Sequence, residues 1–168
     1  ATYNKYLHPD VLDYTNPQMW EDMQNGKIAN LFQFETQVGA VCIKRTRPTS
    51  VAELGAANAV MRLMGEEGEE RPLDRYVRFR NDINEWYKEM DEAGLTPEEQ
   101  QVLKEELLSK YGNSVEQEDM MRLVQRPEIA NFTLGEANLL RKAVAKKDAK
   151  KIEKMKKRFF EAVDEGGE

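Results

Sequence analysis

The segment TLGEANLLRKAVAKKDAKKIEKMKKRFFEAV, residues 133–163, has the pattern of a capped amphipathic helix followed by a second helical stretch. Thr133 and Glu136 fit the capping box, in which a hydroxyl and a carboxylate satisfy each other's backbone donors. Apolar residues then recur at helical spacing, stop across AKKDAKK and resume, which predicts two packed helical stretches. The first apolar group is Leu139, Leu140, Ala143 and Val144, and the second is Ile152, Met155, Phe159 and Val163.

The same segment concentrates positive charge. Arg141 to Arg158 contains ten basic and two acidic residues, a local charge of +8 in a chain whose formal net charge is −6. Lysine-rich helices are often only solvated surfaces. Here, acidic residues are too few for intrahelical pairing to absorb the charge, and packed segments on either side hold the tract in place. Phosphate groups are the natural target of such a patch. The cations that the packing would hold are Arg141, Lys142, Lys146 and Lys147.

The rest of the chain has helical punctuation. Asn16-Pro17 predicts a cap followed by proline at the first helical position, and Ser50–Glu53 and Thr96–Glu99 fit capping boxes. Residues 73–92 predict one long amphipathic helix that Gly94 ends. Further helices are expected around 102–108 and 115–124, and the best strand candidate is only Leu31-Phe32-Gln33-Phe34.

These patterns predict an all-α fold, an irregular multi-helix domain with little or no sheet. We expect residues 1–168 to form a single helical domain, with 141–168 as its basic helical C-terminal segment. The 168 residues suffice for one core. No apolar run approaches the roughly 20 residues of a membrane span, so no membrane partner is expected. The single cysteine, Cys42, fits a reducing cytoplasm, and we expect a monomer.

Most catalytic signatures are missing from the sequence. His8 has no Cys or His neighbour at ligand spacing, and the chain contains no phosphate-binding glycine-rich loop. It also lacks an Asp-x-Asp pair that could hold two metal ions for phosphoryl transfer. We therefore expect no metal site and no cofactor bound by this chain. From the residues alone, it is a helical binding module.

Four blocks, in order, resemble the fingers domain of bacterial replicative DNA polymerases, the polymerase III alpha subunit of family C. Residues 132–163 resemble the family pattern FSLGEADLLRRAMGKK, which a lysine-rich helix ending in RFVEGA follows. NLFQFET (30–36) resembles GIFQFES, and VEQEDMMRL (115–123) resembles VYQEQVMQI. IKRTRPTSVAELGAANAVMR (43–62) resembles LKPTSFEDLVAINALYR with its preceding helix. Together these blocks span about residues 25–163.

The chain departs from the family pattern at several points. Leu63-Met64-Gly65 follows Arg62 where the family has Pro-Gly-Pro, and Glu116 replaces an aromatic residue. The Met and Gly of RRAMGKK are lost, while its four charges are kept. Residues 71–112 match only weakly. These differences indicate a divergent member, of phage or mobile-element origin.

The resemblance implies a fingers segment of a DNA-directed DNA polymerase, which contributes to binding of incoming dNTP and template. In the family, the metal-binding aspartates belong to the palm, which precedes this segment. The isolated chain is therefore expected to be inactive, with Mg²⁺ held by the palm of the full enzyme. Expected partners are template-primer DNA, dNTP and the rest of the polymerase chain.

The resemblance and the charge pattern together assign candidate residues. The candidates for dNTP phosphate are Arg141, Lys142, Lys146, Lys147 and Arg62. Those for DNA are Lys44, Arg45, Arg47, Lys154, Lys156 and Lys157. Gln117 and Glu118 are candidates for bracing the basic helix. Two alternatives remain open at this point: a stand-alone helical nucleic-acid-binding module, and an acidic helical module whose lysine-rich end binds a protein.

Overall fold

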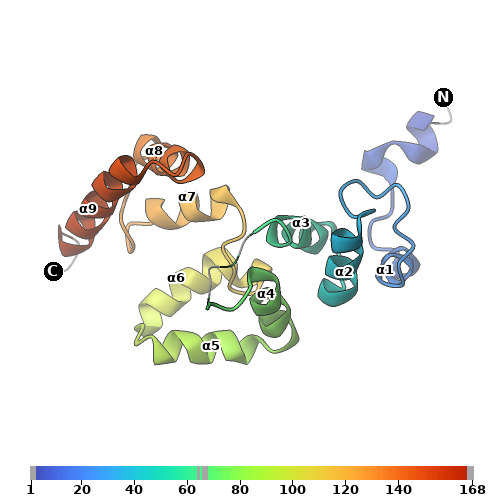
Figure 1. Cartoon of the computed structure of the whole chain (residues 1–168), viewed down its shortest axis with the longest axis horizontal. Coiled ribbons are helices and arrows are strands. Elements are labelled where there is room, and N and C mark those ends of the chain that lie inside the picture. The colour runs from blue at the N-terminus through green and yellow to red at the C-terminus, as the bar shows by residue number, and fades with distance from the viewer. Residues whose placement is uncertain (1–2, 64, 66–67, 166–168) are drawn as a thin grey trace. The chain divides into compact units, whose positions relative to one another are not determined.

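The structure, a computed structural model, describes residues 3–63, 65 and 68–165 (Figure 1). Helices dominate the fold, and the described residues contain no β-strand, as the all-α prediction required. The chain divides into two compact units, Ala1–Val77 and Arg78–Glu168. The prediction of a single domain stays a prediction.

The first unit contains short helical turns followed by α-helices. The Asn16 side chain caps α1 by accepting from the Gln18 backbone N–H at 2.9 Å, as predicted. Ser50 caps α3 by accepting from the Glu53 N–H. The Glu53 carboxylate accepts at 2.6 Å from the N–H of Thr49, the residue before Ser50, whereas a capping box would use the N–H of Ser50 itself. The elements are η1 (Tyr3–Leu7), η2 (Pro9–Val11), α1 (Pro17–Gln24), α2 (Gln37–Thr46), α3 (Val51–Val60) and the start of α4 (Pro72–Asn81).

Residues 31–34 form a turn, so they are not the strand that their alternation suggested. Asn30 and Gln33 have positive φ angles of 64° and 68°, which a strand does not accommodate. The turn buries Phe34 in the core and leaves Phe32 79% exposed. Gly39 lets the first turn of α2 approach Phe34 closely, because a Cβ there would lie 2.5 Å from the Phe34 Cα. The core around Phe34 consists of Trp20, Met23, Ile28, Cys42, Ile43 and Ala57.

The predicted long helix over residues 73–92 is wrong: it is two helices that meet at Asp82. Asp82 has extended backbone, and its carboxylate accepts from the Asn84 N–H at 3.0 Å. Aspartate competes with the backbone ladder in this way and favours a new helix start. The two helices are α4 and α5 (Ile83–Glu92).

The second unit continues with α6 (Pro97–Leu107), η3 (Leu108–Lys110), α7 (Gln117–Gln125), α8 (Leu134–Ala145) and α9 (Ala149–Glu165). Gly94 ends α5 with φ +77°, as predicted. Gly112 also has a positive φ and packs its backbone against the Trp86 ring. Consecutive helices from α6 to α9 contact one another (Figure 1). One core surrounds Trp86, and another joins α7, α8 and α9 through Val124, Phe132, Ala137 and Met155.

Candidate nucleic-acid interface

The start of α8 is fixed by the predicted capping box. The Thr133 hydroxyl accepts from the Glu136 N–H at 3.2 Å, and the Glu136 carboxylate accepts from the Thr133 N–H at 2.8 Å. Ala137 and Ala143 are buried, whereas Leu139, which the sequence pattern assigned to the core, is 56% exposed. The first half of the basic tract is therefore anchored through small residues, because the helices that contact α8 cover the alanine face.

Arg141 lies on α8 and is held by two amide oxygens. Its Nε and one terminal nitrogen donate to Asn138 Oδ1 at 3.1 and 2.9 Å, and its other terminal nitrogen donates to Gln117 Oε1 at 3.1 Å. Gln117 is the first residue of α7, so this contact joins α7 to α8 through two residues that are 24 positions apart in sequence. Both acceptors are neutral amides, so these hydrogen bonds orient the guanidinium without pairing it with an acid.

Beneath Gln117, a fully buried carboxylate organises the start of α7. Asp119 accepts from the backbone N–H groups of Val115 and Glu116 at 3.1 and 3.0 Å. It also accepts from Lys110 Nζ and from Arg122, both at 2.5 Å. A buried carboxylate is tolerated when its charge is paired and its oxygens are hydrogen-bonded, as they are here.

The ionisation of Lys110 follows from this cluster. Burial alone would lower the pKa of its ammonium group, but the hydrogen bonds and charges of Asp119 and Glu116 outweigh burial and raise the pKa. Lys110 therefore stays charged, and the N-terminus of α7 is held by a persistent ion pair. The sequence pattern did not reveal the role of Asp119. Glu116 occupies the cap position of α7, and glutamate is not among the residues that usually mark a helix start, so the box that it forms with Asp119 was not recognised.

The AKKDAKK interruption, residues 145–151, contains a tight turn at Lys146–Asp148 that links α8 to α9. Lys147 has φ +51°, and the Lys147 and Asp148 N–H groups donate to Val144 and Ala143, both at 3.0 Å. This double hydrogen bond is a Schellman ending. Asp148 then caps α9 by accepting from the Lys151 N–H at 3.2 Å. The turn exposes Lys146 and Lys147 at the C-terminal end of α8, where cations also complement the helix dipole.

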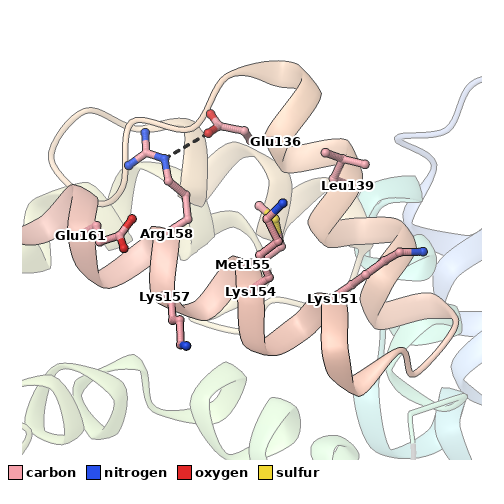
Figure 2. A pocket seen from close by; sticks show the side chains of 8 residues that line it. All are labelled: Glu136, Leu139, Lys151, Lys154, Met155, Lys157, Arg158 and Glu161. Atoms are coloured by element: carbon pink, nitrogen blue, oxygen red, sulfur yellow. Dashed lines mark hydrogen bonds and ion pairs between the residues drawn. The ribbon is translucent and has the colours of Figure 1, made fainter.

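The basic residues of α9 lie on different flanks of the helix. Lys154 and Lys157 line a groove of about 510 Å³ between α8 and α9, together with Lys151, Met155 and Leu139 (Figure 2). Lys156 lines a separate, smaller hollow beside Ile152, Phe159 and Phe160. The three lysines that the sequence grouped for DNA binding therefore do not form one surface.

Arg158 closes one end of the groove by binding back to α8. Its Nε donates to Glu136 at 3.1 Å (Figure 2). Its guanidinium also lies 5.7 Å from the centre of the Phe132 ring. The pKa of the Glu136 carboxyl is lowered, first by the Thr133 backbone and hydroxyl and then by Arg158. Arg158 is thus paired with an acid of the same unit, Glu136.

The remaining candidate cations belong to the first unit. Lys44 and Arg45 lie in the last turn of α2, and Arg47 caps its end with φ +45°. Arg45 forms an ion pair with Asp74 at 2.6 Å. Arg62 is exposed just after α3. Cations at a helix C-terminus stabilise the helix. The positions of Lys44 and Arg45 can therefore be explained by the stability of α2 without a bound ligand.

Two general features bear on the site. Within the described residues, no three His, Cys, Asp or Glu side chains are grouped as a metal ion would require. In the same part of the chain, no helix combines the length and the apolar character of a membrane span.

Cys42 is fully buried, and burial raises the pKa of its thiol to about 11.

Comparison with known proteins gives a consistent result. The family described as "Bacterial DNA polymerase III alpha subunit finger domain" matches residues 1–167. The chain is 42% identical over 166 residues to "Probable DNA polymerase YorL" of Bacillus subtilis (strain 168) and, equally, to "DNA-directed DNA polymerase" of Bacillus phage SPbeta. It is 31% identical over 165 residues to "DNA polymerase III subunit alpha" of Treponema pallidum (strain Nichols).

These matches include nearly all of this chain, 98–99%, but the chain spans about 13% of the length of these three relatives. The match to the family covers both units, including residues 71–112, where the sequence motifs were weakest. Together with the all-helical architecture, it establishes that the chain belongs to the family of bacterial DNA polymerase III alpha subunit finger domains.

Proposed function

We propose that this domain binds the triphosphate of the incoming nucleotide and the template-primer as part of a DNA-directed DNA polymerase. The observation that carries the proposal is Arg141, a half-buried guanidinium that hydrogen bonds orient but no acid neutralises among the described residues. A planar guanidinium suits bidentate phosphate contact. Lys142 is exposed next to it and supplies a point charge.

In nucleotidyl transfer, the leaving pyrophosphate gathers negative charge, and fixed cations stabilise that change in the transition state. Arg141 is fixed by two helices, whereas Lys146 and Lys147 lie on an exposed turn. In this proposal, Arg141 and Lys142 contact the triphosphate. The turn lysines supply longer-range attraction to triphosphate or DNA backbone.

The α9 lysines act on DNA in this proposal. Lys154 and Lys157 share the groove flank, and Lys156 lies on the other flank. Contacts of Lys44, Arg47 and Arg62 with template or nucleotide remain predictions, and Arg45 would first have to leave Asp74. The metal ions of the reaction belong to palm carboxylates that this chain does not supply. The chain alone should therefore not extend a primer.

The test uses the complete polymerase with Arg141→Ala, a Lys154→Ala/Lys157→Ala double variant and a Lys88→Ala control. Lys88 is exposed on α5 and paired only with Glu92, at 3.5 Å, so its loss should change neither property. Arg141→Ala should lower kcat/KM for nucleotide. The decrease should correspond to a loss of about 2–4 kcal/mol of transition-state stabilisation, comparable to the loss of a preorganised donor. The double variant should reduce the salt slope of DNA binding by roughly one to two.

Steady-state nucleotide incorporation at saturating DNA measures the first effect, and anisotropy titrations at several salt concentrations measure the second. If Arg141→Ala weakens only DNA binding and leaves nucleotide kinetics unchanged, the tract is one diffuse electrostatic patch. That result would refute the assignment of Arg141 to the triphosphate.

A further inference from the structure

We propose that Phe32, in the first unit, is a stacking platform for an unpaired base of the DNA template. The inference rests on the proposed function, in which the domain binds template-primer, and adds to it a site for a single-stranded base. Every nucleobase has a π-face on which an aromatic side chain can stack, so such a site holds the template without reading its sequence.

The Phe32 side chain is strongly exposed. Among the described residues, no large hydrophobic side chain is more exposed than Phe32, at 79%. The fold thus forgoes the stabilisation that burial of a phenylalanine provides. Because single exposed hydrophobic residues are common on protein surfaces, exposure alone assigns no role, and the backbone around the ring supplies a second observation.

That backbone consists of two successive β-turns. The Leu31 N–H donates to the Ile28 carbonyl at 3.0 Å, and the Phe34 N–H donates to the Leu31 carbonyl at 2.9 Å. The third residue of each turn has a positive φ, 64° at Asn30 and 68° at Gln33. Asparagine adopts this conformation readily, whereas it is uncommon for glutamine. Backbone held in a sparsely populated conformation is a reason to look for a function at the turn.

The residues on both sides of the ring anchor it to the core of the first unit. Ile28 and Phe34 are buried, and Leu31 packs against the same cluster. The close approach of Gly39 to Phe34 fixes the far end of the turn. The Phe32 ring is therefore presented by a rigid turn, and a ligand that binds a rigid turn loses little affinity to ordering it.

The loop that carries the ring also meets a cation. Lys44 is exposed in the last turn of α2, and a Cβ added at Gly26 would lie 3.8 Å from its Cε. Residues 26–47 contain four basic residues and one acid, although Lys27 and Arg45 are paired with acids of the same unit. Proteins hold single-stranded DNA with aromatic rings for the bases and cations for the backbone. This combination favours a DNA strand over an apolar protein partner.

The family pattern is compatible with this role. GIFQFES, which residues 30–36 resemble, has phenylalanine and glutamine at the positions of Phe32 and Gln33. The exposed ring and the residue that turns the backbone behind it are therefore not peculiar to this divergent chain.

The test uses the complete polymerase and two DNA duplexes of the same sequence, one blunt and one with a template overhang of about ten nucleotides. Phe32→Ala should weaken binding to the overhang DNA on the order of tenfold, as expected for the loss of one stacked base. Binding to the blunt duplex should not change. Phe32→Tyr should retain the affinity because it keeps a ring, whereas Phe32→Leu should lose it although it keeps an apolar side chain.

Val38→Ala is the matched control. Val38 is 65% exposed in the first turn of α2, so this variant removes exposed apolar surface from the same unit without removing a ring. An abasic site, moved along the overhang, should at one position weaken binding of the unsubstituted enzyme and abolish its difference from Phe32→Ala. Because Phe32 and Val38 are exposed, all variants should keep the melting temperature of the unsubstituted enzyme.

Three results would overturn the inference. One is equal affinity of Phe32→Leu and Phe32→Tyr for the overhang DNA, and another is an equal loss in Val38→Ala and Phe32→Ala. Both would mark an apolar docking surface for protein. The third is unchanged binding of overhang DNA by Phe32→Ala. Failure of the proposed function would appear separately, as unchanged nucleotide kinetics in Arg141→Ala and an unchanged salt slope in the Lys154→Ala/Lys157→Ala variant.

Discussion

Replacement of Asp119 by alanine should strongly destabilise the second unit. The carboxylate is fully buried and accepts hydrogen bonds from Lys110, Arg122 and the N–H groups of Val115 and Glu116. Each buried N–H left without an acceptor costs about 1–3 kcal/mol. Breaking a buried ion pair by removing one partner costs about 3–5 kcal/mol in all.

The structure allows the two cations to be weighed separately. The Arg122 side chain is 48% exposed and keeps Glu106, so its loss adds less than about 1 kcal/mol. The Lys110 side chain is only 16% exposed but keeps Glu116 at 2.6 Å, which softens its loss. We therefore expect Asp119→Ala to lower the free energy of unfolding by about 3–5 kcal/mol, mostly through the backbone donors and Lys110.

The assay is urea unfolding of the chain, followed by the fluorescence of Trp86, which is buried in the core of the same unit. A Trp20→Phe background removes the signal of the other unit. With a slope of about 2 kcal/mol per M, the midpoint should fall by roughly 2 M. Glu118→Ala, an exposed acid on the same helix, is the control and should cost under about 1 kcal/mol. A loss for Asp119→Ala no larger than this would refute the reasoning.

Three further predictions concern other parts of the fold. Gly112→Ala should cost about 2–4 kcal/mol, because φ is +74° and the new Cβ would lie 2.3 Å from Trp86, while Gly135→Ala, whose Cβ would make only an ordinary contact of 3.8 Å with Thr133 Oγ1, should be neutral in the same urea assay. Cys42 should react with iodoacetamide at pH 8 at least about 100-fold more slowly in the folded than in the unfolded chain, because its pKa is about 11 and not 9.0; equal rates would contradict its burial. The pKa of Glu136 is lowered from 4.5, so the folded state takes up this proton at a lower pH than the unfolded state does. Stability should therefore fall as pH drops through 4.5 toward the lowered pKa, and Glu136→Gln should flatten that dependence of the urea midpoint on pH.

The local sequence predicted the starts of α1, α3, α6 and α8 and the end of α5, because caps are short-range devices. The Thr96 and Thr133 boxes and the Gly94 ending each depend on atoms within a few residues. The long helix over 73–92 was wrong because the apolar periodicity continues through Asp82, whereas a local contact of the Asp82 carboxylate with the Asn84 N–H starts a new helix there. Periodicity reports which face is buried and does not report whether the backbone is continuous.

The candidate site was only partly predictable. The positive tract is visible in composition, and the exposed turn at Lys146–Asp148 matches the gap in the apolar pattern. The pattern placed Leu139 and Val144 in the core, but they are 56% and 46% exposed, because the buried face of α8 is formed by alanines. It also grouped Lys154, Lys156 and Lys157, which the helix distributes over two flanks.

The sequence by itself determined the all-helical class, the start of α8 and the sign of the charge on it, because each depends on neighbouring residues or on composition. Only the tertiary structure decided which cation is held and by what. Gln117 is 24 positions from Arg141, and Lys110 donates to Asp119 from a different element, η3. Such contacts depend on how helices pack against one another, and packing is set by the whole core, so no local pattern encodes them.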